Sequence, residues 1–172
     1  MLPKLKIVTF SKVLNRNKFD CGSTPLNNYL QQQVSQDIKR CIASCFTIID
    51  ENQTILGYYT LASTSIPLIE LPNYLKKKLP RYPSVPAVLL GRLAIDNQVK
   101  GSGLGKALLG NALKRIIRSE IAAYALIVDA KDQNAKAFYQ TFGFIPFIHE
   151  PNKLFFPLEK IRKQLEQEES AR

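Results

Sequence analysis

The sequence has few of the residues that build metal centres and disulfide frameworks. It contains three cysteines, Cys21, Cys41 and Cys45, and a single histidine, His149. An odd number of cysteines without C-x-x-C spacing, beside one histidine, is a poor metal-ligand set, so we predict no metal site. The same pattern is typical of buried, reduced thiols in a cytoplasmic protein. No apolar run approaches the ~20 residues that cross a bilayer, so we expect no membrane-spanning segment.

Acidic residues are also scarce relative to basic ones. The chain has 24 lysines and arginines against 14 aspartates and glutamates, which gives a formal net charge of +10. This excess of positive charge predicts a polyanionic partner, most often nucleic acid or an anionic membrane surface. A basic surface without a partner is the alternative, and charge alone does not distinguish the two.

A glycine-rich turn past the middle of the chain dominates the pattern. An apolar run, Val88–Ile95, leads into Gln98–Gly105, which reads QVKGSGLG and opens a long amphipathic segment. A strand that feeds such a turn at a helix start predicts an anion site, because the first N–H groups of a helix have no intrahelical partner and the helix dipole favours negative charge. Gly101, Gly103 and Gly105 allow the backbone to approach a ligand closely.

Two nucleotide-binding patterns fit this turn poorly. The Walker pattern requires a hydroxyl after Gly-Lys, but Gly105-Lys106 is followed by Ala107, which offers no ligand to magnesium. The dinucleotide fingerprint requires G-x-G-x-x-G near the first strand of a parallel sheet, whereas this turn reads G-x-G-x-G late in the chain. When the turn is considered alone, the alternative interpretation is an ordinary loop between a strand and a helix, without a ligand.

The order of the predicted elements indicates an α/β fold with a central mixed sheet and helices on both faces. Periodicity and turn residues predict strands at Leu5–Phe10, Cys41–Ile49, Ile55–Ser63, Val88–Ile95, Ala123–Val128, Phe144–Ile148 and Leu154–Phe156. Helices are predicted at Thr24–Ile38, Leu104–Arg118, Asn134–Phe142 and Glu159–Glu169. Strand pairs mixed with crossover helices imply this mixed sheet. The length and the lack of a visible domain boundary predict one domain over residues 1–172.

The segment Ile66–Pro86 differs in composition from the rest of the chain, because it has five prolines around Lys76-Lys77-Lys78 and Arg81. We expect a short helix at Pro72–Leu79 within an otherwise ordered loop. This loop is predicted to bury its apolar residues, which are Leu68, Ile69, Leu71, Leu75, Leu79 and Tyr82. Long loops of this kind are usually functional or disordered.

The glycine-rich turn resembles the Q/R-x-x-G-x-G/A signature of GNAT-type N-acetyltransferases, read here as QVKGSG at Gln98–Gly103. A second segment, NAKAFYQTFGF at Asn134–Phe144, is similar to the A-x-x-F-Y-x-x-x-G-F segment of that family. The resemblance implies the GNAT fold, in which the cofactor enters where two neighbouring strands, here Val88–Ile95 and Ala123–Asp129, splay apart. It also implies that Tyr139 is the general acid; an aromatic core residue is the alternative.

The resemblance further implies acetyl-CoA as the acetyl donor, with its pyrophosphate on the glycine-rich turn and with Lys100 and Lys106 adding positive charge. The residues expected to bind the cofactor are Leu93, Ala94, Ile95, Gln98, Lys100, Gly101, Ser102, Gly103, Leu104, Gly105, Lys106, Asn134 and Phe138.

An acceptor α-amino group titrates near ~7.8, so a strong general base is unnecessary. Asp96 and Asp129 are base candidates for a lysine acceptor, although a turn aspartate and a strand-end cap are the expected roles.

Further segments resemble GNAT toxins of bacterial type II toxin–antitoxin modules over nearly the whole chain. They read FDCG at Phe19–Gly22, LPRYP at Leu79–Pro83, LLGRLA at Leu89–Ala94, VDAKD at Val128–Asp132 and KLFFPL at Lys153–Leu158. This resemblance implies acetylation of the α-amino group of aminoacyl-tRNA, which blocks translation, together with a ribbon-helix-helix antitoxin, a homodimer and no membrane partner. Many of these toxins carry Arg where this chain has Gln98, so one phosphate contact is expected to be weaker.

A tRNA substrate gives the basic residues a role, because phosphate neutralisation dominates nucleic-acid binding. The residues expected to bind tRNA are Lys76, Lys77, Lys78, Arg81 and Arg92. Solvated surface charge is the alternative for each lysine. Arg92 differs, since a charge in a buried strand must be paired or face a cleft.

Two other functions stay open on the sequence. One is acetylation of a protein N-terminus, a polyamine or a drug amine; an acidic cleft would favour the polyamine, and the basic loop argues against it. The other is a non-catalytic GNAT domain that binds RNA or an antitoxin, against which Tyr139 and the complete glycine turn speak. A Tyr139→Phe variant separates the classes, because an enzyme would lose growth inhibition and a pure binder would keep it.

Overall fold

The computed structural model describes residues 4–172, and the chain divides into two compact units. The first comprises the chain up to Ala62 together with Leu90–Leu113, and the second comprises Ser63–Leu89 together with Lys114–Arg172. The strands follow the order β1-β2-β3-β4-β5-β7-β6 in a seven-stranded sheet. Within residues 4–172, no helix is both long and apolar enough to cross a membrane.

The first unit is built on antiparallel strands. Strand β1 (Lys6–Thr9) pairs with β2 (Ser44–Ile49), and β2 pairs with β3 (Ile55–Pro67) with a register shift at Ile48/Ile49. The end of β4 (Ser84–Ile95) belongs to the same unit. Its buried core includes Phe10, Leu14, Phe19, Tyr29, Leu30, Val34, Ile55 and Tyr58.

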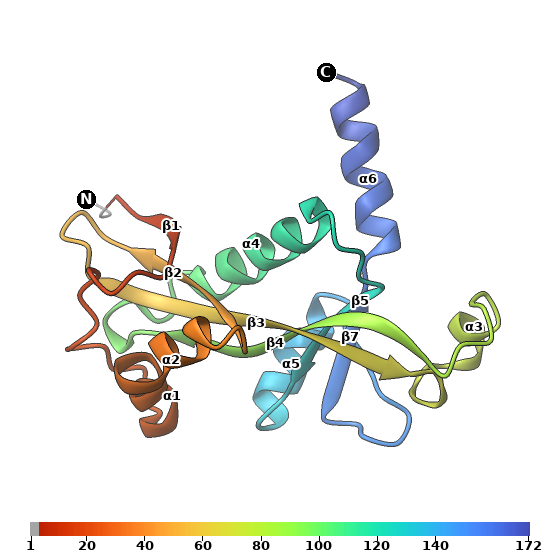
Figure 1. Ribbon diagram of the computed structural model, residues 1–172, viewed down its shortest axis with the longest axis horizontal. Helices are drawn as coiled ribbons and strands as arrows, with labels where there is room; N and C mark the ends of the chain where they lie inside the picture. Colours follow the sequence, from red (N-terminus) through yellow and green to blue (C-terminus); the bar gives the residue numbers. More distant parts are fainter. Residues whose placement is uncertain (1–3) are drawn as a thin grey trace. The chain divides into compact units, whose positions relative to one another are not determined.

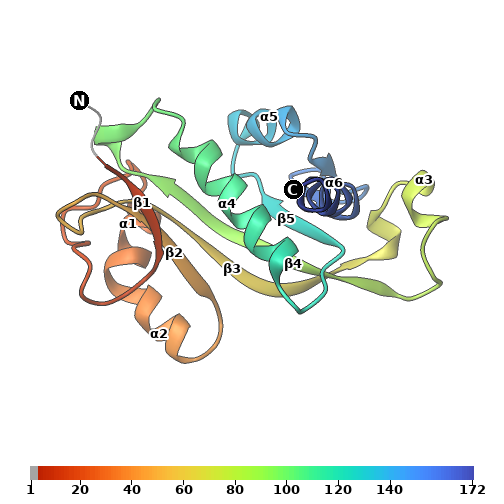
Figure 2. The same cartoon turned by 90° about the horizontal axis from the view of Figure 1, so that it is seen from above.

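Helices cover both faces of these strands (Figures 1 and 2). Tyr58 Oη donates to the carbonyl oxygen of Leu26 in α1 (Thr24–Asn28) at 2.7 Å. The next residue, Tyr59, donates through its Oη to Asn111 Oδ1 in α4 (Leu104–Arg118) at 2.6 Å. Because successive strand residues point to opposite faces, α1 and this part of α4 lie on opposite sides of β3.

The predicted helix from Thr24 to Ile38 is interrupted by a π turn, which the sequence did not predict. Helix α1 passes into η1 (Tyr29–Gln33), a π-helical turn, and then into α2 (Val34–Lys39). Tyr29, Leu30 and Val34 are all buried, and the spacing of five between Tyr29 and Val34 matches a π turn. Pro25 lies in the first turn of α1, as predicted.

The second unit contains the closing strands and the C-terminal helices. Strand β5 (Ala125–Asp129) pairs antiparallel with β7 (Lys153–Pro157), which also pairs with β6 (Ile145–Pro146). Helices α5 (Gln133–Thr141) and α6 (Glu159–Ser170) belong to this unit. Its buried core includes Ile66, Leu68, Leu71, Val85, Ala125, Ile127, Phe147 and Phe155. The strand pair predicted to close the fold is confirmed.

The segment predicted as a long loop is shorter than expected. Strand β3 continues to Pro67 and β4 begins at Ser84. Between them lie a 3-10 turn, η2 (Leu68–Glu70), and a helix of one turn, α3 (Asn73–Lys76). The prediction that all its apolar residues are buried is wrong, because Ile69 and Tyr82 are 63% and 62% exposed.

The prediction of three buried thiols is also partly wrong. All three cysteines are free; Cys21 and Cys45 are buried, but Cys41 is exposed. Cys41 has a φ of 60° in the turn that follows α2, and this turn holds its side chain outside the core.

Candidate functional site

The glycine-rich turn between β4 and α4 is open on its outer side. Gly101 and Gly103 have φ angles of 81° and 82°, a left-handed conformation that glycine adopts without strain. Apart from each glycine and its two chain neighbours, no residue in the range 4–172 has a heavy atom within 4 Å of the position that a Cβ would occupy. The backbone is therefore accessible to a ligand, which suits a phosphate group at the start of a helix.

The other residues of the turn differ in exposure. Gln98, Ser102 and Lys106 are exposed, whereas Leu104 and Gly105 are half-buried. The first helical bond of α4 runs from the Ala107 N–H to the Gly103 carbonyl oxygen at 3.2 Å. The N–H groups that precede Ala107 in α4 have no intrahelical acceptor, by helix geometry.

The segment around Asp20 supports the turn. The Asn97 N–H donates to the Asp20 carbonyl oxygen at 2.8 Å, and Lys100 Nζ donates to the Cys21 carbonyl oxygen at 2.6 Å. Lys100, which was predicted to bind phosphate, therefore has one of its three donors engaged by backbone. This contact fixes the ammonium group beside Gly22, where a Cβ would lie 3.6 Å from Lys100 Nζ.

Asp20 is itself fixed by two donors. Its Oδ1 accepts from the Gly22 N–H at 2.9 Å and from Asn27 Nδ2 at 3.0 Å. These two hydrogen bonds lower the pKa of the Asp20 carboxyl, and the bond from the Gly22 N–H has the larger effect. The positive charge of Lys100 also lowers this pKa. The FDCG segment at Phe19–Gly22 thus has a structural role in shaping the glycine-rich turn.

Asp96 is a buried turn aspartate. Its side chain accepts from the Gln98 N–H at 2.9 Å and from the Asp20 N–H at 3.1 Å, and the residue is 5% exposed. Both acceptor oxygens are occupied by backbone donors that shape η3 (Asn97–Val99). This arrangement agrees with the structural role expected for Asp96 rather than with a general base.

The end of β4 is packed tightly against β3. A Cβ at Gly57 would lie 2.9 Å from Ile95 Cδ1 and 3.1 Å from the Ala94 carbonyl oxygen, so a larger residue does not fit there. Ala94 is buried, and Leu93 and Ile95 are half-buried. The three strand residues predicted to run beside the cofactor are therefore held in one position.

Tyr139 lies on α5 in the second unit. Asp132 caps this helix by accepting from the Ala135 N–H at 2.7 Å, and Gly143 follows its C-terminus with a φ of 94°, as predicted. Tyr139 is 8% exposed, and its ring packs against those of Phe138 and Phe144 with centroids 5.3 Å away in each case. Burial raises the pKa of Tyr139 to about 12, so the phenol is protonated at neutral pH.

The two remaining residues predicted on α5 precede Tyr139. Asn134 is exposed and Phe138 is half-buried. Their spacing of four places them on one face of the helix.

The segment between β3 and β4 encloses a hollow with a basic rim. The cavity has a volume of about 880 Å³, and its lining includes Leu68 and Leu79 with Lys76, Lys77 and Arg81. These cations and Lys78 are exposed. Three of the four predicted tRNA-binding residues of this segment, Lys76, Lys77 and Arg81, therefore line one hollow, and Lys78 is not among its lining residues.

Arg92 belongs to the first unit. It is half-buried, and its guanidinium carbon lies 3.5 Å from the centroid of the Tyr29 ring. Sequence reasoning predicted that this charge is paired or faces a cleft, and the partner in the structure is an aromatic face. No sequence pattern identified Tyr29, because the two residues are far apart in the chain.

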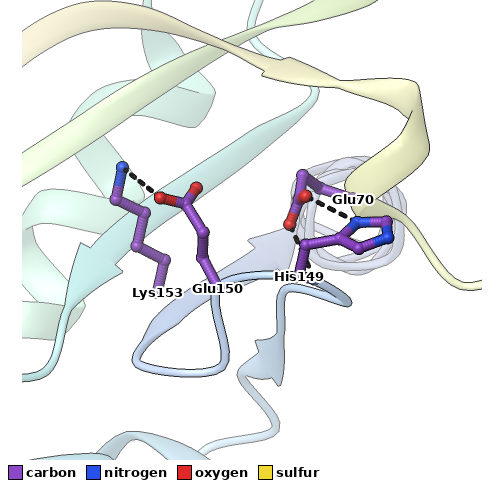
Figure 3. Close-up of polar contacts among 4 residues, drawn as sticks. All are labelled: Glu70, His149, Glu150 and Lys153. Carbon is purple, nitrogen blue, oxygen red and sulfur yellow. Dashed lines mark hydrogen bonds and ion pairs between the residues drawn. The ribbon is translucent and has the colours of Figure 1, made fainter.

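A buried carboxylate that the sequence also did not reveal lies in the second unit (Figure 3). Glu70 is 5% exposed, and its two oxygens contact the backbone N–H of His149 at 3.0 Å and Nδ1 of the same residue at 2.9 Å. The Ile148 N–H donates to the Glu70 carbonyl oxygen at 3.1 Å. Glu70 thus ties η2 to the loop between β6 and β7.

Comparison with known proteins gives this geometry a context. Residues 81–155 match the family model described as an acetyltransferase (GNAT) domain. A protein of Mycobacterium tuberculosis named tRNA-acetylating toxin is 32% identical over 128 residues, which cover 73% of this chain and 75% of that protein.

Solved structures are similar over almost the whole chain. The AtaT toxin complexed with acetyl-methionyl-tRNAfMet superposes with a TM-score of 0.88 at 30% identity and covers 94% of this chain and 99% of that one. A mutant AtaT toxin bound to the C-terminus of the antitoxin AtaR and acetyl-CoA superposes with a TM-score of 0.79 at 27% identity, over 94% of this chain and 98% of that one.

Proposed function

The chain belongs to the GNAT acetyltransferases, among the toxins of toxin–antitoxin modules, and we propose that it transfers the acetyl group of acetyl-CoA to the α-amino group of aminoacyl-tRNA. Acetylation of that amine removes the nucleophile needed for peptide-bond formation, so translation stops. The observation that carries the proposal is the open turn at Gly101 and Gly103, placed at the start of α4.

The residues of the turn fit a pyrophosphate. Two glycines in the left-handed region leave the backbone uncovered, and the start of α4 favours negative charge. Acetyl-CoA supplies the activated acetyl group when it is bound. Its pyrophosphate is held by Gln98, Lys100, Gly101, Ser102, Gly103, Leu104, Gly105 and Lys106, and its pantetheine arm follows Leu93, Ala94 and Ile95, with Asn134 and Phe138 as further contacts.

Tyr139 acts as the general acid. The leaving sulfur needs a proton, and a buried phenol with a pKa of about 12 carries one throughout the neutral range. The aromatic rings of Phe138 and Phe144 limit the orientations of the Tyr139 ring. The α-amino group of the acceptor is partly neutral near pH 7.8, so the chain needs no strong base.

Lys76, Lys77, Lys78, Arg81 and Arg92 bind the phosphates of the tRNA. All lie exposed or half-buried, and the net charge of +10 supports attraction of a polyanion. A solved relative bound to acetyl-methionyl-tRNAfMet supports this class of substrate.

Four finer features complete the proposal. An antitoxin neutralises the chain, supported by a relative bound to its antitoxin. We infer from the family resemblance that this antitoxin is of the ribbon-helix-helix type. The toxin is a homodimer and acts in the cytoplasm. Residues 1–172, of which 1–3 lie outside the described part, form a single catalytic domain, supported by a solved relative that matches 94% of the chain.

The test is transfer of label from acetyl-CoA to tRNA. Purified protein is incubated with labelled acetyl-CoA and either a charged or a deacylated tRNA pool. We expect label on the charged pool alone, and loss of that label in a Tyr139→Phe variant. Label on neither pool, with acetyl-CoA binding intact, would redirect the search to protein N-termini and small amines.

A further inference from the structure

We propose that Arg92 is a preorganised phosphate-binding residue whose ligand is a phosphodiester at the single-stranded acceptor end of the tRNA. Tyr29 and Asp37 act as positioning residues that hold it. The inference rests on the proposed function and specifies one contact within it. The three residues come from β4, η1 and α2 of the first unit.

The guanidinium of Arg92 is stacked on an aromatic ring. Its central carbon lies 3.5 Å from the centroid of the Tyr29 ring, and Tyr29 is only 3% exposed. A separation this short brings the plane of the guanidinium against the ring face, where the cation–π attraction is strong. The side chain of Arg92 therefore has little freedom to leave this position.

Tyr29 is fixed in turn by its other contacts. Its hydroxyl donates to Asp37 Oδ2 at 2.9 Å, and its ring stacks on Tyr58 with an interplanar angle of 16°. The π turn at Tyr29–Gln33 brings this residue into the core. π turns of this kind are frequent at functional sites.

Arg16 and Arg92 both lie over an aromatic ring, but they differ in the hydrogen bonds of their guanidinium groups. Arg16 also lies over an aromatic ring, that of Phe10, but it donates to the Leu30 carbonyl oxygen at 2.9 Å and to Ser35 Oγ at 3.3 Å. The side chain of Arg92 makes no hydrogen bond or ion pair with any residue in the described range 4–172, and its contact is with the Tyr29 ring. Its five N–H donors are thus available at the edge of a guanidinium whose face is already held.

The chemistry of this edge favours a phosphate. A planar guanidinium presents parallel N–H groups that match two oxygens of a phosphate. Because stacking already restricts the Arg92 side chain, less side-chain entropy is lost when a phosphate binds. Asp37, which belongs to this cluster, accepts from the Tyr29 hydroxyl and forms no ion pair with Arg92. An anionic ligand therefore meets an uncompensated positive edge.

The position of Arg92 selects the acceptor end of the tRNA. Arg92 lies three residues before Ile95 on β4, which corresponds to about 10 Å of extended chain. Ile95 belongs to the strand segment proposed to follow the pantetheine arm, at whose end the acceptor amine must react. Only the terminal, unpaired nucleotides can be this close to that amine, and single strands can present their phosphates individually.

The experiment compares acceptors that differ in phosphate content. They are charged tRNA, an aminoacylated CCA trinucleotide, and a 3′-aminoacyl adenosine without a 5′-phosphate. For an Arg92→Met variant, we expect kcat/KM to fall about tenfold or more on the first two acceptors, because a charged hydrogen-bonded contact is lost. On the phosphate-free adenosine ester the variant should match the wild type, and its Kd for acetyl-CoA should be unchanged.

Two further readouts test the electrostatic character of the contact. The slope of log affinity for charged tRNA against log salt should become shallower by about 0.7 in Arg92→Met. It should keep its wild-type value in Lys160→Met, which removes an exposed charge from α6. Arg92→Lys keeps the charge but loses the planar edge, so its salt slope should stay near wild type while its kcat/KM on charged tRNA falls.

Substitutions of Tyr29 test the positioning role. Tyr29→Leu removes the stacking face and should lower kcat/KM on the two phosphate-bearing acceptors in the direction of Arg92→Met. Tyr29→Phe keeps the ring and should show a smaller loss. Thermal unfolding of each variant identifies any that fail to fold.

Defined results would overturn the inference. They are equal activity of Arg92→Met and wild type on every acceptor, an equal loss on the phosphate-free ester, or a loss confined to antitoxin binding. If the adenosine ester reacts too slowly, a neutral methylphosphonate linkage in the trinucleotide replaces it, and this change should reduce the wild type to the level of the variant. Absence of wild-type transfer to charged tRNA would instead contradict the proposed function itself.

Discussion

At the scale of single residues, the proposed acid Tyr139 is a phenol that lies in a hydrophobic environment. A buried phenol that keeps its proton suits a donor to a leaving thiolate. The burial that raises the pKa of Tyr139 to about 12 also explains why its helix predicted a core residue as the alternative. The proposed acid role is compatible with the core position, because the burial of the phenol is what raises its pKa.

Tyr139→Phe removes the proton and keeps the ring. We expect kcat to fall by about 10²- to 10⁴-fold while the Kd for acetyl-CoA and the melting temperature stay near wild type. Steady-state kinetics with charged tRNA, isothermal titration with acetyl-CoA and thermal unfolding check the three parts. A variant with full activity would contradict the assignment of Tyr139 as the acid.

The pH dependence of the wild type follows from the same pKa. As pH rises, the acceptor amine loses its proton near ~7.8, so kcat/KM should increase. Because the pKa of Tyr139 is raised, the acid form persists, and the rate should stay level to about pH 11 rather than fall near the ordinary phenol value of ~10. A decline that begins near pH 9 and is absent in Tyr139→Phe would contradict this expectation.

The two left-handed glycines of the turn have a matched control on α4. Gly101→Ala and Gly103→Ala force a Cβ into a conformation that costs about 1–2 kcal/mol, so the Kd for acetyl-CoA should rise about tenfold. Gly110→Ala adds a Cβ within a helix, where no heavy atom of residues 4–172 lies within 4 Å apart from its chain neighbours and the backbone of its own helix, and should stabilise by about 0.5–1 kcal/mol. Calorimetric titration and thermal unfolding of all three variants provide the comparison.

At this scale the sequence predicted local features better than distant contacts. The Gly143 helix stop and the glycine turn depend on residues next to one another, so their patterns were sufficient. The contact of Arg92 with Tyr29 and that of Glu70 with His149 depend on folding, which brings together residues that share no local pattern. The roles of the individual cofactor residues stay predictions.

At the scale of elements, α4 and the helix before β2 show where periodicity succeeds and where it fails. The predicted bounds Leu104–Arg118 coincide with those of α4, because the apolar stripe is long and regular. The segment Thr24–Lys39 carries an equally regular pattern, yet a π turn shifts its second half. Ile38 is 36% exposed as a result, although it was predicted on the apolar side.

The connection between β4 and α4 depends on the Asp96 carboxylate. Asp96→Ala leaves the N–H groups of Asp20 and Gln98 without their acceptor, which should cost about 2 kcal/mol and lower the melting temperature by about 4–8 °C. Asp129→Ala, which removes an exposed carboxylate at the end of β5, should change stability little. Retention of the wild-type pH profile by both variants would agree with structural roles, whereas loss of its rising limb would identify a general base.

At the scale of the whole molecule, the net charge of +10 is the property that sequence reasoning connected to tRNA. Its use in binding depends on where the charges lie. Lys76, Lys77 and Arg81 line a hollow whose lining also includes apolar residues. The sequence indicated the basic run but not the hollow. The hollow is lined by the residues between the end of β3 and the start of β4, and both strands extend further into the predicted loop than expected.

A salt titration separates this surface from the remaining charge. Replacing Lys76, Lys77 and Lys78 by Gln should make the slope of log affinity for tRNA against log salt shallower by about 2–3, since each lost phosphate contact contributes about 0.7–0.9. The control replaces three exposed cations of α6, Lys160, Arg162 and Lys163, and should change the slope less. Equal effects of the two triple variants would assign binding to overall charge.

In the proposed reaction, the chain places the acetyl group on the α-amino group of an aminoacyl-tRNA. Mass spectrometry of the 3′-terminal nucleoside, released by nuclease after incubation with acetyl-CoA and charged tRNA, measures this directly. We predict N-acetylaminoacyl adenosine from the wild type and unmodified aminoacyl adenosine from Tyr139→Phe. Acetyl groups on a base, a ribose hydroxyl or a side-chain amine, or a charged tRNA left unmodified, would contradict the account.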